Sequence, residues 1–329
     1  MERIAIIGSG TWGSALAIHL ATNKKEVRLW SRFKEEKDSL EKTLTHPNLP
    51  KAKFPSSIIF TSSLAKAIQG AEQVVIATPS PYVRETVRKC KEFLNPKQII
   101  ICVAKGIEEG TLYTMSEVIQ DELGQEYNIV ALSGPSHAEE VSIGLPTTIV
   151  SACKDLEIAK KVQKTFNSAF FRVYTNEDIK GVEIAGATKN IIAIACGISE
   201  GLGFGDNAVA ALVTRGLTEI TRLGLALGCS KKTFFGLSGV GDVVVTATSV
   251  HSRNHKAGIL LGKGHKLEDV KKEVGMVIEG INCLQAAREL SDSLGVQMPI
   301  VDGIYKLVFS GKPPLKVVNE LFARELKSE

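Results

Sequence analysis

The sequence predicts a two-domain α/β protein, in which a doubly wound, mostly parallel sheet is followed by an all-helical domain. Near its start, an apolar strand ends in G-x-G-x-x-G and passes directly into a helical pattern. Strands and helices then alternate up to about residue 178, and helical periodicity dominates beyond it. A length of 329 residues also favours two domains, because single cores stop growing near ~250–300 residues. We expect the domains to span 1–180 and 181–329.

The first strand, Ile4–Ile7, leads into three glycines with separate tasks. Gly8 makes the tight turn, Gly10 lets the backbone approach a pyrophosphate, and Gly13 lets the following helix pack closely on the strand. The unpaired amides at the helix start face the anion. Glycine-rich turns are common, but this one lies between a strand and a helix at βαβ spacing. The pattern therefore predicts a Rossmann-type dinucleotide site.

The second strand, Val27–Trp30, ends at Ser31-Arg32. An acidic residue at this point binds the ribose hydroxyls of NAD(H), whereas an arginine accommodates the 2′-phosphate of NADP(H). The nearest acidic residues, Glu35 and Glu36, are displaced by a turn from the end of this strand. Arg32 therefore favours NADP(H) without excluding NAD(H), and a solvated surface arginine is the alternative.

The remaining elements of the first domain alternate in type, after a polar stretch at 34–53 that we interpret as a helix and a surface loop. Predicted strands are 57–60, 73–78, 98–104, 128–132, 147–152 and 171–174, and predicted helices are 62–70, 82–94, 111–123 and 155–167.

In the second domain the only strand signal is Val243-Val244-Val245. We expect the active site in the cleft between the two domains. Predicted helices are 183–200, 207–228, 254–262, 282–294, 299–309 and 314–327.

Composition and charge exclude several classes of protein. A net charge of +4 with scattered lysines is too mild for nucleic-acid binding. The six cysteines form neither a metal-ligand pattern nor a disulfide framework, so we expect buried thiols, no metal and a cytoplasmic location. The first strand starts too early for a signal peptide, and the uncharged run 141–153, which contains Pro146, is too short to span a membrane.

Ligands of such a sheet collect beyond the carboxyl ends of its strands. The strand at 98–104 ends at Lys105, whose amine could reach a bound anion or carbonyl, although it could also be an ordinary loop lysine. The strand at 128–132 ends in a loop that contains Gly134 and Ser136. Its hydroxyls and amides could bind the same ligand, or the loop could simply cap a helix.

Lys189 lies in the middle of a helix that is apolar on nearly every face. Burial disfavours the charged form of a lysine, so a buried amine becomes available as a base near neutral pH. Lys189 is therefore a candidate catalytic residue. Its alternatives are a lysine that extends to the surface and an ion pair with Glu183 or another neighbour.

Ser252-Arg253-Asn254 precede a helical run and gather hydroxyl, guanidinium and amide donors at a helix start. This is a favourable phosphate site, although serine is also a common helix cap. Asp242, in a predicted glycine-rich turn, could hold a substrate hydroxyl, orient Lys189, or serve only the turn.

Taken together, these stretches resemble the bacterial type of NAD(P)-dependent glycerol-3-phosphate dehydrogenase. The resemblance depends on several motifs in order: GSGTWGSA (8–15), AKGI (104–107), LSGPS (132–136), GATKN (186–190), GFGDN (203–207), TRGL (214–217), LSGVGD (237–242), SRN (252–254) and EG (279–280).

This resemblance implies reversible reduction of dihydroxyacetone phosphate to sn-glycerol 3-phosphate with NADP(H) or NAD(H), for phospholipid synthesis, by a homodimer. It implies that Lys189 is the proton acceptor. The implied substrate residues are Lys105, Gly134, Ser136, Lys189, Asp242, Ser252, Arg253 and Asn254. The implied cofactor residues, besides the three glycines, are Thr11, Trp12, Arg32, Lys105, Ala138, Arg253, Val277 and Glu279.

Two other functions fit the same residues less well. A related two-domain reductase of a 2-keto or hydroxy acid would not need the phosphate donors at 252–254. A nicotinamide-sensing protein without catalysis would not need a lysine in a buried helix.

Overall fold

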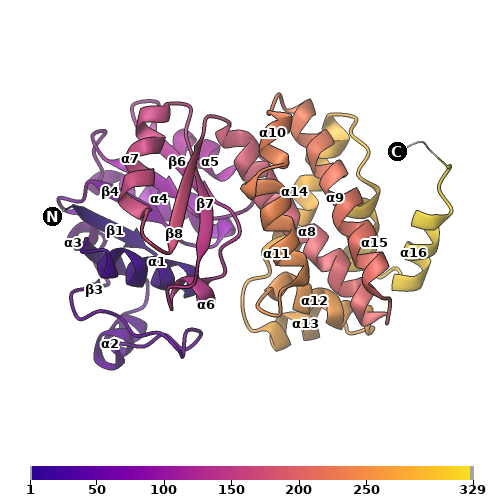
Figure 1. Cartoon of the computed structure of the whole chain (residues 1–329), viewed down its shortest axis with the longest axis horizontal. Helices are drawn as coiled ribbons and strands as arrows, with labels where there is room; N and C mark the ends of the chain where they lie inside the picture. The colour runs from indigo at the N-terminus through magenta and orange to yellow at the C-terminus, as the bar shows by residue number, and fades with distance from the viewer. Residues whose placement is uncertain (1, 327–329) are drawn as a thin grey trace. The chain divides into compact units, whose positions relative to one another are not determined.

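The computed structural model of the protein describes residues 2–326, which form two compact units (Figure 1). Unit 1 comprises Met1–Lys105 and Tyr113–Glu183, and unit 2 comprises Gly106–Leu112 and Ile184–Glu329. Position 327, the predicted end of the last helix, lies outside the described residues.

Unit 1 contains one eight-stranded sheet in the order β3-β2-β1-β4-β5-β6-β7-β8. Every neighbouring pair is parallel except β6 and β7, which confirms the predicted doubly wound, mostly parallel sheet. The strands are β1 (Arg3–Ile7), β2 (Glu26–Trp30), β3 (Ile59–Thr61), β4 (Gln73–Ile76), β5 (Ile99–Cys102), β6 (Asn128–Ser133), β7 (Thr147–Ala152) and β8 (Phe171–Asn176).

The central strands are apolar throughout because helices cover both faces of the sheet. In β1, Ile4 and Ile6 belong to one buried cluster while Ala5 and Ile7 belong to the other. Helices α1 and α7 contribute to the first cluster, and α3, α4 and α5 contribute to the second. The helical elements of unit 1 are α1 (Thr11–Thr22), α2 (Lys34–Thr43), α3 (Leu64–Ile68), η1 (Ser80–Tyr82), α4 (Val83–Cys90), η2 (Lys91–Phe93), α5 (Met115–Leu123), α6 (Ala138–Val141) and α7 (Leu156–Phe166).

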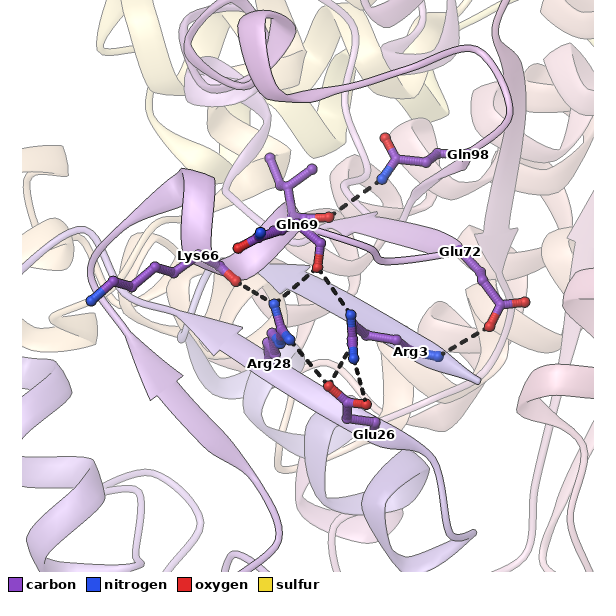
Figure 2. A network of polar contacts seen from close by, with 8 residues as sticks. Arg3, Glu26, Arg28, Lys66, Gln69, Glu72 and Gln98 are labelled. Atoms are coloured by element: carbon purple, nitrogen blue, oxygen red, sulfur yellow. Dashed lines mark hydrogen bonds and ion pairs between the residues drawn. The ribbon is translucent and has the colours of Figure 1, made fainter. Parts of the chain in front are cut away.

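A polar network joins the amino ends of β1 and β2 to the end of α3 (Figure 2). Glu26 accepts from Arg3 at 2.5 Å and from Arg28 at 3.2 Å. Arg28 also donates to the carbonyls of Lys66 and Gln69, at 2.7 and 2.9 Å, and so caps the end of α3. Because ligands bind at the carboxyl ends of the strands, this network serves the fold rather than the candidate site.

Unit 2 is helical, and no strand occurs among its described residues. Val243–Val245 lie in a helix, so their strand preference was misleading; Val243 is fully buried and Val244 is exposed. The short helices α10, α11 and α13 were not predicted. The elements are α8 (Ile179–Gly201, which begins in unit 1), α9 (Asp206–Ala226), α10 (Lys231–Phe234), η3 (Leu237–Gly241, a π-helical turn), α11 (Asp242–Thr248), α12 (Arg253–Gly262), α13 (Leu267–Val274), α14 (Glu279–Ser293), α15 (Pro299–Ser310) and α16 (Pro314–Phe322).

Helix α8 is the buried centre of this arrangement. By length and composition it could cross a membrane, although Glu183 and Lys189 interrupt its uncharged residues. Its apolar window is completely buried inside the protein, as expected of a core helix.

Helices α8 and α12 are in backbone contact through glycines on both sides. A Cβ atom on Gly197 would lie 2.1 Å from the carbonyl oxygen of His255, and one on Gly258 would lie 2.2 Å from that of Ile194. Gly201 and Gly262 repeat the relation one turn further along. Only glycine permits helices to pack this closely.

We predict that Gly258→Ala destabilises the protein by about 1–3 kcal/mol, because the added methyl group forces α8 and α12 apart. Gly205→Ala is the matched control, since a Cβ there meets nothing within 4 Å and its φ is −86°. Urea unfolding of both variants checks the prediction, and equal stabilities would contradict it.

A buried carboxylate caps α15. Glu219 of α9 accepts from the amide of Ile300 at 2.9 and 3.1 Å and from that of Val301 at 3.4 Å. Burial raises the pKa of the Glu219 carboxyl from 4.5 to about 7. Because the folded-state pKa lies above the unfolded value, the folded protein binds this proton more tightly. Its contribution to stability is therefore greatest below pH 4.5 and is lost as the pH rises to about 7.

We predict that Glu219→Gln removes this pH dependence. The stability of the variant relative to the parent protein should rise by up to about 3 kcal/mol between pH 4.5 and pH 7.5. Denaturant unfolding of both proteins across this range measures the difference between their free energies of unfolding. The other titrating groups are common to both proteins, so their contributions cancel. A difference that does not change with pH would refute the assignment.

Candidate functional site

The glycine loop after β1 has the geometry that its three glycines predict. Gly8 has a φ of +126°, and a Cβ there would lie 2.8 Å from the carbonyl carbon of Ala77. A Cβ on Gly13 would lie 2.0 Å from the oxygen of Gly8. Nothing lies within 4 Å of a Cβ built on Gly10, so the backbone there is open to a ligand.

The start of α1 can receive an anion. Gly10 occupies the N-cap without a side-chain hydrogen bond, and the first turn contains no acidic residue. Thr11 is buried and accepts a hydrogen bond from the Asn48 amide at 3.1 Å, and Trp12 is half-buried beside it. These residues fit a dinucleotide pyrophosphate at the helix start.

Arg32 follows the carboxyl end of β2. Its side chain is 55% exposed, and its guanidinium lies 4.0 Å from Glu85 and 5.9 Å from the centre of the Phe33 ring. An exposed guanidinium at this edge of the sheet is accessible to the phosphate of a cofactor.

The tips of β5 and β6 bring three predicted residues together. Lys105 donates to the carbonyl oxygen of Gly134 at 3.2 Å, and the Ser136 hydroxyl donates to the same oxygen at 3.0 Å. Gly134 has a φ of +141°, and a Cβ there would be only 3.0 Å from the backbone of Ile149. Ala138 is buried at the start of the short helix α6.

Lys189 is only 6% exposed, so the alternative of a lysine reaching the surface is wrong. Its amine donates to the Asp242 carboxylate and, at 2.7 Å, to the Thr246 hydroxyl. Glu183 instead accepts from the amide and hydroxyl of Ser116, at 2.8 and 2.5 Å. The ion pair of Lys189 is therefore with Asp242 rather than with Glu183.

Thr246 is a site residue that sequence reasoning missed. Asp242 is the first residue of α11 rather than part of a turn, so the side chain four positions later lies on the same helix face. Thr246 also donates to the Asp242 carbonyl at 2.6 Å, which leaves its oxygen oriented to accept from Lys189. The i, i+4 spacing would have revealed this residue had the helix been predicted.

The start of α12 combines capping with ligand donors. Ser252 accepts from the His255 amide at 3.2 Å, so the capping interpretation is correct for its side chain. Arg253 is exposed and donates to the Val277 carbonyl at 3.2 Å. Val277 belongs to the predicted cofactor set, so a residue of that set contacts the predicted phosphate site.

Asn254 links three helices. Its amide nitrogen donates to the Asn190 side chain of α8 at 3.0 Å, and its oxygen accepts from the Gly280 amide of α14 at 2.9 Å. Asn190 directly follows Lys189, so the helix that carries the buried amine is hydrogen-bonded to the start of α12. Asn190 was also missed, because an amide in an apolar helix has no distinctive spacing.

Within residues 2–326, no three His, Cys, Asp or Glu side chains are placed to hold a metal ion. Unit 2 contains a buried amine held by a carboxylate and a hydroxyl, and cationic and amide donors at the start of α12. Together with a glycine loop in unit 1 whose geometry fits a pyrophosphate, these features are typical of the class of nicotinamide-dependent dehydrogenases that have a separate helical unit.

Comparison with known proteins identifies the family. Residues 3–159 match the N-terminal family model of NAD-dependent glycerol-3-phosphate dehydrogenase, and residues 178–319 match its C-terminal counterpart. The protein belongs to the NAD-dependent glycerol-3-phosphate dehydrogenase family, as its motifs indicated.

Similar proteins match over the full length. "Glycerol-3-phosphate dehydrogenase [NAD(P)+] 2" of Lactobacillus delbrueckii subsp. bulgaricus is 50% identical, covering 100% of this chain and 99% of its own. The enzyme of Oceanobacillus iheyensis is 48% identical, covering 100% and 96%. The crystal structure of glycerol-3-phosphate dehydrogenase from Coxiella burnetii has a TM-score of 0.94 at 36% identity, covering 98% of this chain and 99% of that one.

We predict that Thr246→Val lowers kcat about tenfold or more, because a hydrogen bond to a charged group contributes roughly 1.5–3 kcal/mol. The loss should exceed any change in the KM of the cofactor. Thr246→Ser keeps the hydroxyl and is the control. Steady-state dehydrogenase kinetics measure both variants, and equal turnover would show that the hydroxyl does not support Lys189.

Proposed function

We propose that the protein catalyses the reversible reduction of dihydroxyacetone phosphate to sn-glycerol 3-phosphate with a reduced nicotinamide cofactor. Family membership, the buried Lys189–Asp242–Thr246 group and the hydrogen bond that joins the same helix, α8, to the start of α12 support this proposal. The direct test is oxidation of NADPH and of NADH by the purified protein with dihydroxyacetone phosphate. A protein active only on 2-keto acids, or on no substrate, would overturn it.

In this proposal, residues 1–180 supply most of the cofactor contacts, and residues 181–329 supply the catalytic lysine and most of the substrate contacts. The glycine loop and the start of α1 bind the pyrophosphate through backbone amides, with Thr11 and Trp12 beside them. A nicotinamide cofactor held by these residues would supply the hydride for reduction of C2 of the substrate. We assign Arg32, Lys105, Ala138, Arg253, Val277 and Glu279 as the remaining cofactor contacts.

Arg253, Asn254 and Ser252 bind the substrate phosphate and thereby hold its C2 in position, which removes entropy from the barrier. Lys189 donates a proton to the C2 oxygen during reduction and accepts it during oxidation. Asp242 and Thr246 hold the amine in place throughout. We assign Lys105, Gly134 and Ser136 as further substrate contacts.

The wider role follows from the same resemblance. We propose that the enzyme acts in the cytoplasm as a homodimer, without membrane insertion, and that its product feeds phospholipid synthesis. NADP(H) is the proposed main cofactor because Arg32 is exposed at the carboxyl end of β2.

We predict that Lys189→Met lowers kcat by ~10²–10⁴, the usual contribution of a general acid or base, and leaves NADPH affinity unchanged. Lys180→Met is the control, because this α8 lysine is partly exposed and paired with Glu117 at 2.7 Å. Turnover assays and fluorescence titration with NADPH provide the two measurements. Near-normal turnover of Lys189→Met would exclude it as the proton carrier.

We predict that Arg253→Ala lowers kcat/KM for glycerol 3-phosphate about 10- to 100-fold, because a charge-assisted hydrogen bond to the phosphate is lost. The kcat/KM for glycerol should fall far less. Lys256→Ala removes a cation from the same helix and is the control. The comparison uses kcat/KM for both substrates. Equal losses on the two would contradict a phosphate role.

A further inference from the structure

Glu36 is a candidate specificity residue that no sequence motif singles out. It lies in the first turn of α2, and its carboxylate accepts hydrogen bonds from the hydroxyls of Ser9, at 2.9 Å, and Ser31. Ser9 stands between Gly8 and Gly10 of the glycine loop, and Ser31 directly follows β2. Both serines are buried, so the carboxylate is fixed between the loop and the strand end.

This position matters because of what binds there in dinucleotide-binding folds. An acidic group at the end of the second strand accepts hydrogen bonds from the adenosine ribose hydroxyls, and a 2′-phosphate at the same point is repelled by it. In this protein the residues directly after β2 are Ser31 and Arg32. The acidic group at this point is the Glu36 carboxylate of the following helix, α2. Its position in the sequence does not reveal this contact.

The charge of Glu36 is not neutralised by its neighbours. Among the ion pairs of residues 2–326, none includes Glu36, and the Arg32 guanidinium lies beside Glu85. His46 is near the Glu36 carboxylate, but its Nδ1 accepts from the Asn48 amide at 3.1 Å. Burial lowers the pKa of His46 below 6.5, so it is neutral at pH 7 and supplies no counter-charge.

We propose that Glu36 sets cofactor specificity in opposition to Arg32. Its carboxylate accepts a hydrogen bond from the adenosine 2′-hydroxyl of NAD(H) and disfavours the 2′-phosphate of NADP(H). Arg32 attracts that phosphate. The cofactor preference of the enzyme is the balance of these two side chains. This inference rests on the proposed function, since it concerns the cofactor of that reaction.

The test compares Glu36→Gln with Glu35→Gln. Glutamine at position 36 can still accept from a serine but has no charge, whereas Glu35 is an exposed neighbour whose loss changes the net charge equally. We expect Glu36→Gln to raise the NADPH-to-NADH ratio of kcat/KM about tenfold, with the gain decreasing at high salt. Glu36→Ala should shift the ratio the same way, and Arg32→Ala should shift it the opposite way.

Fluorescence titration with NADPH and NADH, without substrate, measures the same ratio independently of turnover. An unchanged ratio in Glu36→Gln and Glu36→Ala, or an equal shift in Glu35→Gln, would overturn the role of Glu36 while leaving the enzyme assignment intact. If the parent protein instead bound both cofactors but reduced no dihydroxyacetone phosphate, the proposed function would fail, and the binding ratio would still test Glu36.

Discussion

The close contact between α8 and α12 is the constraint on which the chemistry of unit 2 depends. Glycines at 197, 201, 258 and 262 let the two backbones touch, so the start of α12 is held beside the middle of α8. Asn254 then reaches Asn190, which directly follows Lys189. The candidate proton carrier and the candidate phosphate site therefore lie on one closely packed helix pair, and their spacing does not depend on flexible loops.

The protein provides its buried ionisable side chains with partners in two ways. Lys189 has a carboxylate and a hydroxyl as partners, whereas Glu183 and Glu219 receive donors from helix starts. Burial nevertheless raises the pKa of both glutamates to about 7. At the glycine loop, by contrast, the Glu36 carboxylate accepts from the hydroxyls of Ser9 and Ser31, and it forms no ion pair among residues 2–326.

Most of unit 1 could be predicted because its signals are local. Apolar runs such as β4 and β5 are buried on both faces, and the glycine loop needs residues without a Cβ at defined points. Prediction was weaker in unit 2. There the β-branched run in α11 favoured a strand, and packing of Val243 in the helical core overrode that preference. Short helices such as α10 and α13 lack enough turns for a clear period.

The sequence by itself determined the doubly wound sheet, the helical second half, the dinucleotide loop and the candidate lysine, because each depends on periodicity or on spacing along the chain. Only the tertiary structure decided which partners these residues have. Lys189 pairs with Asp242 rather than with Glu183. Thr246 and Asn190 belong to the candidate site as well. Glu36 accepts a hydrogen bond from Ser9 of the glycine loop. Such contacts join residues that are distant in sequence, so they depend on how helices pack, which no local pattern encodes.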